Sequence, residues 1–201
     1  KISPFIATLG MMSITRGLAQ VLSDEKPIYF EGTPEFYSLF MGKPLLGIPN
    51  AVFIMFGAAV VASLVLTKTS LGRYTFALGS NEEATRLSGV NVDRWKIAVY
   101  AVCGLYAGLA GTLIAARMNS AQPSVGMGYE LDAIAAAVIG GTSLSGGEGS
   151  IFGTVIGAFI ISTLTIGLSI TGVQDQYKLV ITGLVVIGAV WLDILRRNRR
   201  S

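Results

Sequence analysis

The sequence predicts an all-α fold, a polytopic transmembrane helix bundle with about five to six membrane segments and a short cytoplasmic helix. Of its 201 residues, 52% are hydrophobic and only 13% are charged, whereas a soluble domain carries about 25% charged residues. The charges gather in short islands between long uncharged runs. Several of these runs approach the length of about 20 residues that a helix needs to cross the hydrocarbon core of a bilayer.

Six stretches are candidates for the membrane segments. Lipid offers the backbone no hydrogen bonds, so a stretch that crosses it is expected to be helical. Three of the stretches are long enough without argument, and three are short or rich in glycine. The long ones are 48–66, 97–116 and 151–170, and the weaker ones are 2–15, 131–147 and 179–192.

Basic residues predict the orientation, because cytoplasmic loops carry an excess of Lys and Arg. The island 67–96 holds five basic residues and the tail 196–201 holds four, so both are expected to face the cytoplasm. Two ends on one side require an even number of crossings between them, and the segment 131–147 is needed to make that number even. Because this segment ends in the Gly-rich run 140–147, it stays open whether 131–149 is a full span or re-entrant. The four crossings are 97–116, 131–147, 150–172 and 178–195.

In this arrangement residues 16–46 form the longest extracytoplasmic loop. Its aromatic side chains favour a partly structured segment anchored at the lipid headgroups. The alternative interpretation is a docking surface for an extracytoplasmic partner. The aromatic residues are Tyr29, Phe30, Phe36, Tyr37 and Phe40.

Absent residue types and motifs narrow the chemistry. The chain has no His, which excludes an imidazole base and a His-containing zinc site, and it has no phosphate-binding P-loop motif. We therefore expect no enzymatic activity, no metal and no cofactor. The composition also excludes a disordered chain, a nucleic-acid binder and a disulfide scaffold. The uncharged spans disfavour an ion-driven carrier, which usually places a charged residue within the membrane.

Glycines recur within the predicted spans, often four residues apart. Small residues at this spacing let membrane helices approach closely, which indicates a compact bundle without indicating a substrate. The candidate packing residues are Gly104, Gly108, Gly111, Gly140, Gly141, Gly153 and Gly157.

A short capped helix is predicted inside the island 67–96. Ser80 and Glu83 have the spacing of a capping box, and Gly89 is suited to the position after a helix end. Residues 81–88 are therefore expected to form about two helical turns.

Glu82 and Arg86 are spaced for an i,i+4 ion pair on this helix. A helix of this length is not stable alone, so we expect another element to pack against it. From the residues alone, a solvated elbow on the membrane surface stays an open alternative.

Several stretches, in the same order along the chain, resemble the permease subunits of bacterial sugar ABC importers of the ribose, xylose and galactoside type. The resemblance covers essentially the whole chain, which starts without an initiator Met. It implies that residues 1–201 are a single permease domain lacking its N-terminal spans. The similar stretches are 4–19, 79–90, 128–136, 140–147 and 153–158.

The resemblance implies a multi-pass subunit of the bacterial inner membrane that forms the translocation path for a monosaccharide. Its implied partners are a second permease subunit in a homo- or heterodimer, a cytoplasmic ABC ATPase dimer that hydrolyses the ATP, an extracytoplasmic sugar-binding protein and membrane lipid. No nucleic acid is expected. Three alternatives stay open: a permease for another small solute, such as an autoinducer, a nucleoside or a branched amino acid; a stand-alone secondary carrier; and a membrane anchor.

The resemblance also assigns roles to residues. The short helix would be the coupling helix that fits a groove in the ATPase, and hydroxyl and amide groups near the spans would line the path of a neutral polyol. The ATPase-coupling residues would be Asn81, Glu82, Glu83, Ala84, Arg86, Leu87, Ser88 and Gly89. The substrate-path residues would be Pro4, Phe5, Thr8, Asn119 and Gln122.

Overall fold

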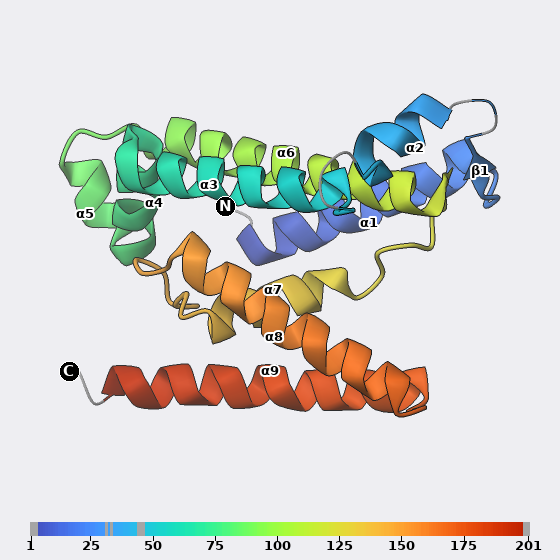
Figure 1. Ribbon diagram of the computed structural model, residues 1–201. Helices are drawn as coiled ribbons and strands as arrows, with labels where there is room; N and C mark the ends of the chain where they lie inside the picture. Colours follow the sequence, from blue (N-terminus) through green and yellow to red (C-terminus); the bar gives the residue numbers. More distant parts are fainter. Residues whose placement is uncertain (1–3, 31, 33, 44–46, 199–201) are drawn as a thin grey trace. The chain divides into compact units, whose positions relative to one another are not determined.

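Figure 1 shows the computed structural model, which describes residues 4–30, 32, 34–43 and 47–198. The chain divides into two compact units, one made of 1–54 with 105–127 and the other of 55–104 with 128–201. Its elements follow in the order α1 (Pro4–Ser23), β1 (Ile28–Tyr29), α2 (Pro34–Met41), α3 (Asn50–Lys68), α4 (Ser70–Ser80), α5 (Glu82–Leu87), α6 (Val92–Met118), β2 (Ser120–Ala121), α7 (Tyr129–Ile139), α8 (Ile151–Ile170) and α9 (Asp175–Asn198).

The all-α fold class is confirmed, since helices dominate the described residues and the two strands have two residues each. Three helices of the described chain are long and apolar enough to cross a membrane: α3 with 19 residues, α6 with 27 and α8 with 20. They correspond to the three strong candidates. A shorter apolar stretch, Gln176–Trp191, lies within α9.

Three elements differ from the prediction. α1 continues past the apolar stretch to Ser23, so the first residues of the predicted loop 16–46 are helical. α4 was not predicted, because its mixed, glycine-containing sequence has no apolar run. The predicted span 131–147 is not one helix: α7 ends at Ile139, where a Gly140–Gly141 pair follows and Gly141 has a φ of +89°.

In the first unit, a two-residue strand pair joins the loop after α1 to the segment after α6. β1 and β2 pair antiparallel, with Ile28 opposite Ala121 and Tyr29 opposite Ser120. The N–H of Phe30 extends this pairing by donating to the backbone oxygen of Asn119 at 3.2 Å. The two loops that the charge pattern predicts on the extracytoplasmic side are therefore hydrogen-bonded to each other.

The predicted extracytoplasmic loop is partly structured. It contains α2, and the rings of Phe30 and Phe40 each pack edge-on against Phe36, with centroid distances of 5.1 and 5.3 Å. Tyr29 and Tyr37 are exposed instead. Residues 31, 33 and 44–46 of this predicted loop lie outside the described residues.

In the second unit, α7 packs on α8 and α9. Ala135, Ala136 and Val138 of α7 and Ile161 of α8 are buried. Most of the large apolar side chains on the long helices are exposed, and an exposed apolar surface of this extent indicates contact with lipid or with other helices.

Candidate functional site

The candidate site is the α5 corner, which we define as residues 74–96: the second half of α4, α5 and the first turns of α6. Asn81 separates α4 from α5, and its side-chain Oδ1 accepts a hydrogen bond from the N–H of Ala84 at 2.9 Å. Such an N-cap satisfies one of the unpaired N–H groups at a helix start. The predicted capping box is wrong, because Ser80 is the last residue of α4 and the cap falls one residue later.

The C-terminal end of α5 agrees with the prediction. Ser88 is the C-cap residue, and its N–H donates to the backbone oxygen of Ala84 at 3.1 Å. Gly89 follows with a φ of +83°, in the left-handed region that glycine adopts without steric cost. The helix therefore spans Glu82–Leu87, one residue shorter at each end than the predicted range 81–88.

Two cations hold Glu82 of α5. Arg86 Nη2 lies 3.3 Å from Glu82 Oε1, which confirms the predicted i,i+4 pair, and Lys96 Nζ lies 2.6 Å from Glu82 Oε2. Lys96 belongs to α6, so its ion pair ties the short helix to a long one. These side chains are partly exposed, and such pairs contribute roughly 0–1 kcal/mol each.

The two faces of α5 differ in burial. Thr85 is buried, and its hydroxyl donates to the backbone oxygen of Asn81 at 2.8 Å. Leu87 is 84% exposed. The helix is therefore fixed from one side and presents an uncovered apolar side chain on another.

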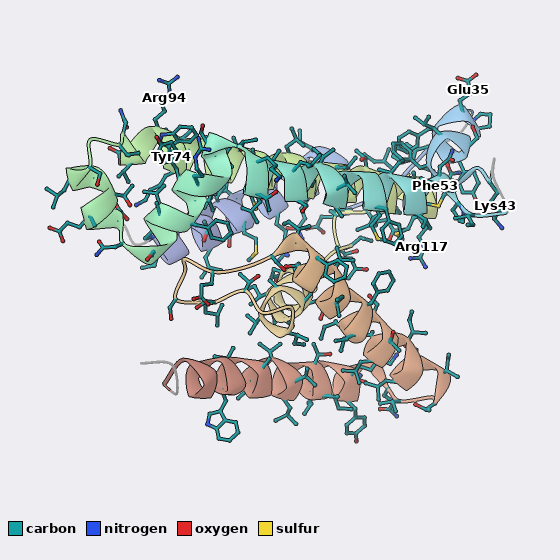
Figure 2. The ribbon with its side chains drawn as sticks, turned by 60° about the vertical axis from the view of Figure 1, so that its left-hand side comes forward. Glu35, Lys43, Phe53, Tyr74, Arg94 and Arg117 are labelled. Atoms are coloured by element: carbon teal, nitrogen blue, oxygen red, sulfur yellow. The ribbon has the colours of Figure 1, made fainter. Side chains whose placement is uncertain are left out.

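An aromatic pair joins α4 to the start of α6. The rings of Tyr74 and Trp95 have their centroids 4.5 Å apart and are tilted by 40°. Figure 2 shows Tyr74 beside the start of α6, while Arg94 projects away from the ribbon. At the α6 start, the N–H of Arg94 donates to Asn91 Oδ1 at 3.1 Å. The α5 corner is therefore fixed on both sides of α5.

The glycine-rich loop after α7 lies against the α5 corner. A Cβ built on Gly79 would lie 2.7 Å from the backbone nitrogen of Gly147, and one on Gly146 would collide with the carbonyl group of Gly79. A Cβ on Gly147 would lie 3.1 Å from Cβ of Ser80. Backbone therefore meets backbone here, with no room for a side chain between the two segments.

The predicted packing glycines fall into three groups. A Cβ on Gly153 would collide with the carbonyl oxygen of Gly140, and one on Gly157 would collide with that of Ala136. Gly141 has a positive φ and serves the turn after α7. A Cβ on any of the three α6 glycines would meet no atom of its own unit within 4 Å: Gly104, Gly108 and Gly111.

The predicted substrate-path residues lie at two places in the first unit. Asn119 has a φ of +50°, and close by Gln122 Nε2 donates to Ser120 Oγ at 3.3 Å. Pro4 and Thr8 lie in the first turns of α1, whose 20 residues make it about 30 Å long. The side chain of Phe5 lies outside the described residues.

Ser120 is the functional candidate that the predicted set lacks in this turn. It is 2% exposed, and its hydroxyl donates to the backbone oxygen of Met118 at 3.3 Å. It lies in β2 opposite Tyr29 of β1, a pairing of distant segments that local sequence does not encode. Among the described residues, no three Cys, Asp or Glu side chains come together as a metal site.

The long apolar helices indicate a multi-pass membrane protein. A family model described as "Branched-chain amino acid transport system / permease component" matches residues 1–190, and the chain belongs to this permease family. It is a family of transport proteins rather than of enzymes.

Curated relatives include sugar permeases. The chain is 48% identical over 193 residues to the ribose import permease protein of Bacillus subtilis, covering 96% of this chain and 60% of the relative. It is 42% identical over 192 residues to the D-allose transport system permease protein of Escherichia coli K12, covering 96% and 58%. It is 39% identical over 200 residues to the L-arabinose transport system permease protein of the same strain, covering 100% and 60%.

The predicted resemblance to sugar importer permeases is confirmed by these relatives. The chain spans about 60% of the length of the first relatives. No solved structure matches it.

Proposed function

We propose that this chain is part of the membrane-spanning permease of an ABC importer, which forms the translocation path for a monosaccharide and is driven by a separate ATPase. Relatives that match nearly the whole chain are named as permeases for ribose, allose and arabinose. These names support a pentose or hexose as cargo. One observation carries the proposed coupling to an ATPase: the short helix α5 is fixed by Asn81 and Lys96, while the side chain of Leu87 on it is uncovered.

The α5 corner supports an interface with a motor protein. An apolar side chain on a rigid short helix can fill a pocket of a partner without losing much conformational freedom on binding. Arg86 next to Leu87 adds a charge that fixes orientation. We assign Leu87 and Arg86 as the main contacts with a cytoplasmic ABC ATPase dimer and Asn81, Glu82 and Gly89 as the residues that hold the helix in shape.

The path of the chain from α6 to α8 supports the predicted even number of crossings. α6 begins at the α5 corner and, with 27 residues, carries the chain about 40 Å away from it. The contact of Gly146 with Gly79 brings the chain back to that corner. The predicted crossing between α6 and α8 therefore agrees with this geometry.

The returning segment is not a simple span. α7 has 11 residues and is about 16 Å long, which is about half of the hydrocarbon thickness. Irregular backbone at membrane depth is tolerated only where it is covered by protein or lines a water-filled cavity, and broken helices often form transporter binding sites. We propose that α7 and the polar turn of Asn119, Ser120 and Gln122 contribute to the translocation path, and that Pro4, Phe5 and Thr8 line another part of it.

The remaining assignments follow from the same proposal. The importer lies in the bacterial inner membrane, with the island 67–96 and the tail 196–201 on the cytoplasmic side and the loop 16–46 outside, where a secreted sugar-binding protein docks. A second permease subunit completes the path, and the open faces of Gly104, Gly108 and Gly111 on α6 suit its approach.

Reconstitution of the full-length protein tests this function. Proteoliposomes holding the permease, the ATPase and the binding protein encoded with it should take up labelled ribose, allose or arabinose only when ATP is supplied. Labelled leucine serves as the control cargo, because the family description names branched-chain amino acids. Sugar uptake by the permease alone, driven by an ion gradient, would instead identify a stand-alone carrier.

A further inference from the structure

We propose that the loop 140–150 is a rigid link that carries the displacement of α5 to the α7–α8 pair. This inference rests on the proposed function, because it needs a motor that moves α5. It assigns a positioning role to the contact of Gly79 with Gly146 and Gly147, which joins two segments far apart in the sequence.

The first part of the link is the contact at the α5 corner. Gly79 is the next-to-last residue of α4, directly before Ser80 and the N-cap residue of α5. Its backbone touches that of Gly146 and Gly147 with no side chain between. A side chain at such an interface can change rotamer and absorb a small movement, whereas a backbone in direct contact transmits it.

The second part is the loop itself, which its own hydrogen bonds close. The N–H of Ser143 donates to the backbone oxygen of Glu148 at 3.0 Å, and the N–H of Gly146 donates to the oxygen of Ser143 at 3.1 Å. A Cβ on Gly149 would lie 2.9 Å from the hydroxyl oxygen of Thr142. The ends of the loop are thus held together, so it moves as one piece.

The third part joins the loop to the two helices that it connects. The N–H of Thr142 donates to the backbone oxygen of Ala137 in α7 at 2.9 Å. At the other end, Ser150 caps α8 by accepting from the N–H of Gly153 at 3.0 Å. Gly140 and Gly153 meet backbone to backbone. An unbroken series of close contacts therefore leads from α5 to α7 and α8.

The first experiment replaces Gly79 by Ala. In a helix this exchange normally stabilises the protein, because Gly is the poorer helix former, so a harmful effect comes from the collision with Gly147. Gly57→Ala in α3 is the matched control, since a Cβ there meets nothing within 4 Å. Both variants are made in the full-length permease and reconstituted with its ATPase and binding protein.

The readout is the ratio of ribose transported to ATP hydrolysed. For Gly79→Ala we expect the complex to assemble and hydrolyse ATP, while this ratio falls about tenfold. Gly57→Ala should keep the ratio of the unmodified protein. A Gly79→Ala complex that transports with an unchanged ratio would overturn the rigid link.

A disulfide cross-link tests the link without relying on a collision. Ser80→Cys and Gly147→Cys introduce two cysteines whose Cβ atoms would lie 3.1 Å apart, so a small shift brings them to the spacing of about 3.5–4.5 Å that a disulfide needs. The free Cys103 is replaced by Ala in this background, and the Gly147→Cys single variant controls for the strain of a side chain at a positive φ. A rigid link predicts that oxidation forms the cross-link and that the cross-linked importer still transports ribose.

Loss of transport on oxidation, restored by reduction, would show that the two segments separate during the cycle and would overturn the proposal. Failure of the cross-link to form would contradict the contact itself. Failure of the proposed function looks different: the unmodified complex would then show no ATP-dependent uptake of any of the three sugars.

Discussion

Lys96 on the first turns of α6 reaches back 14 residues to Glu82 on α5, with Nζ and Oε2 2.6 Å apart. This ion pair fixes a helix of six residues that would not be stable alone. The fixed helix then holds Leu87 in an uncovered position. In the proposed function, coupling to the ATPase depends on this arrangement, and the contributions of Glu82, Lys96 and Leu87 can be tested separately.

Exchanging the charges of Glu82 and Lys96 tests the ion pair. Glu82→Lys alone puts three cations together and should lower the sugar-stimulated ATPase activity of the reconstituted complex. Adding Lys96→Glu restores an opposite pair, with a coupling energy of roughly 0.5–1 kcal/mol in a thermal unfolding double-mutant cycle. If Glu82→Lys and the double variant Glu82→Lys/Lys96→Glu had equal stabilities, the ion pair would not hold α5.

Leu87→Asp tests the proposed contact with the ATPase. A charge at an apolar anchor should weaken binding of the ATPase about tenfold or more, without changing the unfolding temperature, because Leu87 is 84% exposed and packs on little of its own chain. The control Leu87→Met keeps apolar volume and should bind normally. Pull-down of the ATPase by the detergent-solubilised permease measures both. Unchanged binding by Leu87→Asp would remove Leu87 from the interface.

Asn81→Ala tests the position of the helix cap. Loss of the hydrogen bond to Ala84 should cost about 1 kcal/mol of α5 stability and speed hydrogen exchange of the amides in α5. Asn81→Asp should retain the cap. Ser80→Ala should have little effect on the stability of α5, since Ser80 belongs to α4. If Ser80→Ala lowered this stability more than Asn81→Ala, Ser80 would be the N-cap residue instead.

Gly153→Ala tests the packing of α7 on α8. The added Cβ collides with the carbonyl oxygen of Gly140, and overpacking of this kind costs about 1–3 kcal/mol. Gly167→Ala lies in the same helix with nothing within 4 Å and should leave the unfolding temperature of the permease unchanged or slightly raised. Equal unfolding temperatures for the two variants would contradict the close contact.

The long helices could be predicted because hydropathy is a local property. The uncharged runs that predicted spans became α3, α6 and α8, and Gly89 correctly marked the end of α5. The sequence also predicted the pair of Glu82 and Arg86, because a helix of known position fixes its i,i+4 neighbours.

The parts that failed depend on tertiary contacts. α4 has no apolar run, and its Tyr74 packs on Trp95 instead. The glycines after 139 left open whether 131–149 is a full span or re-entrant, and the local sequence could not show that α7 ends at Ile139. The approach of Gly146 to Gly79 joins distant segments without any side chain, so no residue pattern could have indicated it. The substrate-path residues were chosen for their chemistry. The structure places Asn119 and Gln122 in one turn and Pro4 and Thr8 at the start of α1.

Accessibility of position 88 tests the central claim, that α5 faces the cytoplasm and binds the ATPase. Ser88→Cys in the full-length permease, with Cys103 replaced by Ala, places one thiol next to Leu87. A membrane-impermeant maleimide should label it in inside-out vesicles and not in intact cells, and bound ATPase should protect it. Labelling from outside intact cells would contradict the orientation and, with it, the assignment of α5 as the coupling helix.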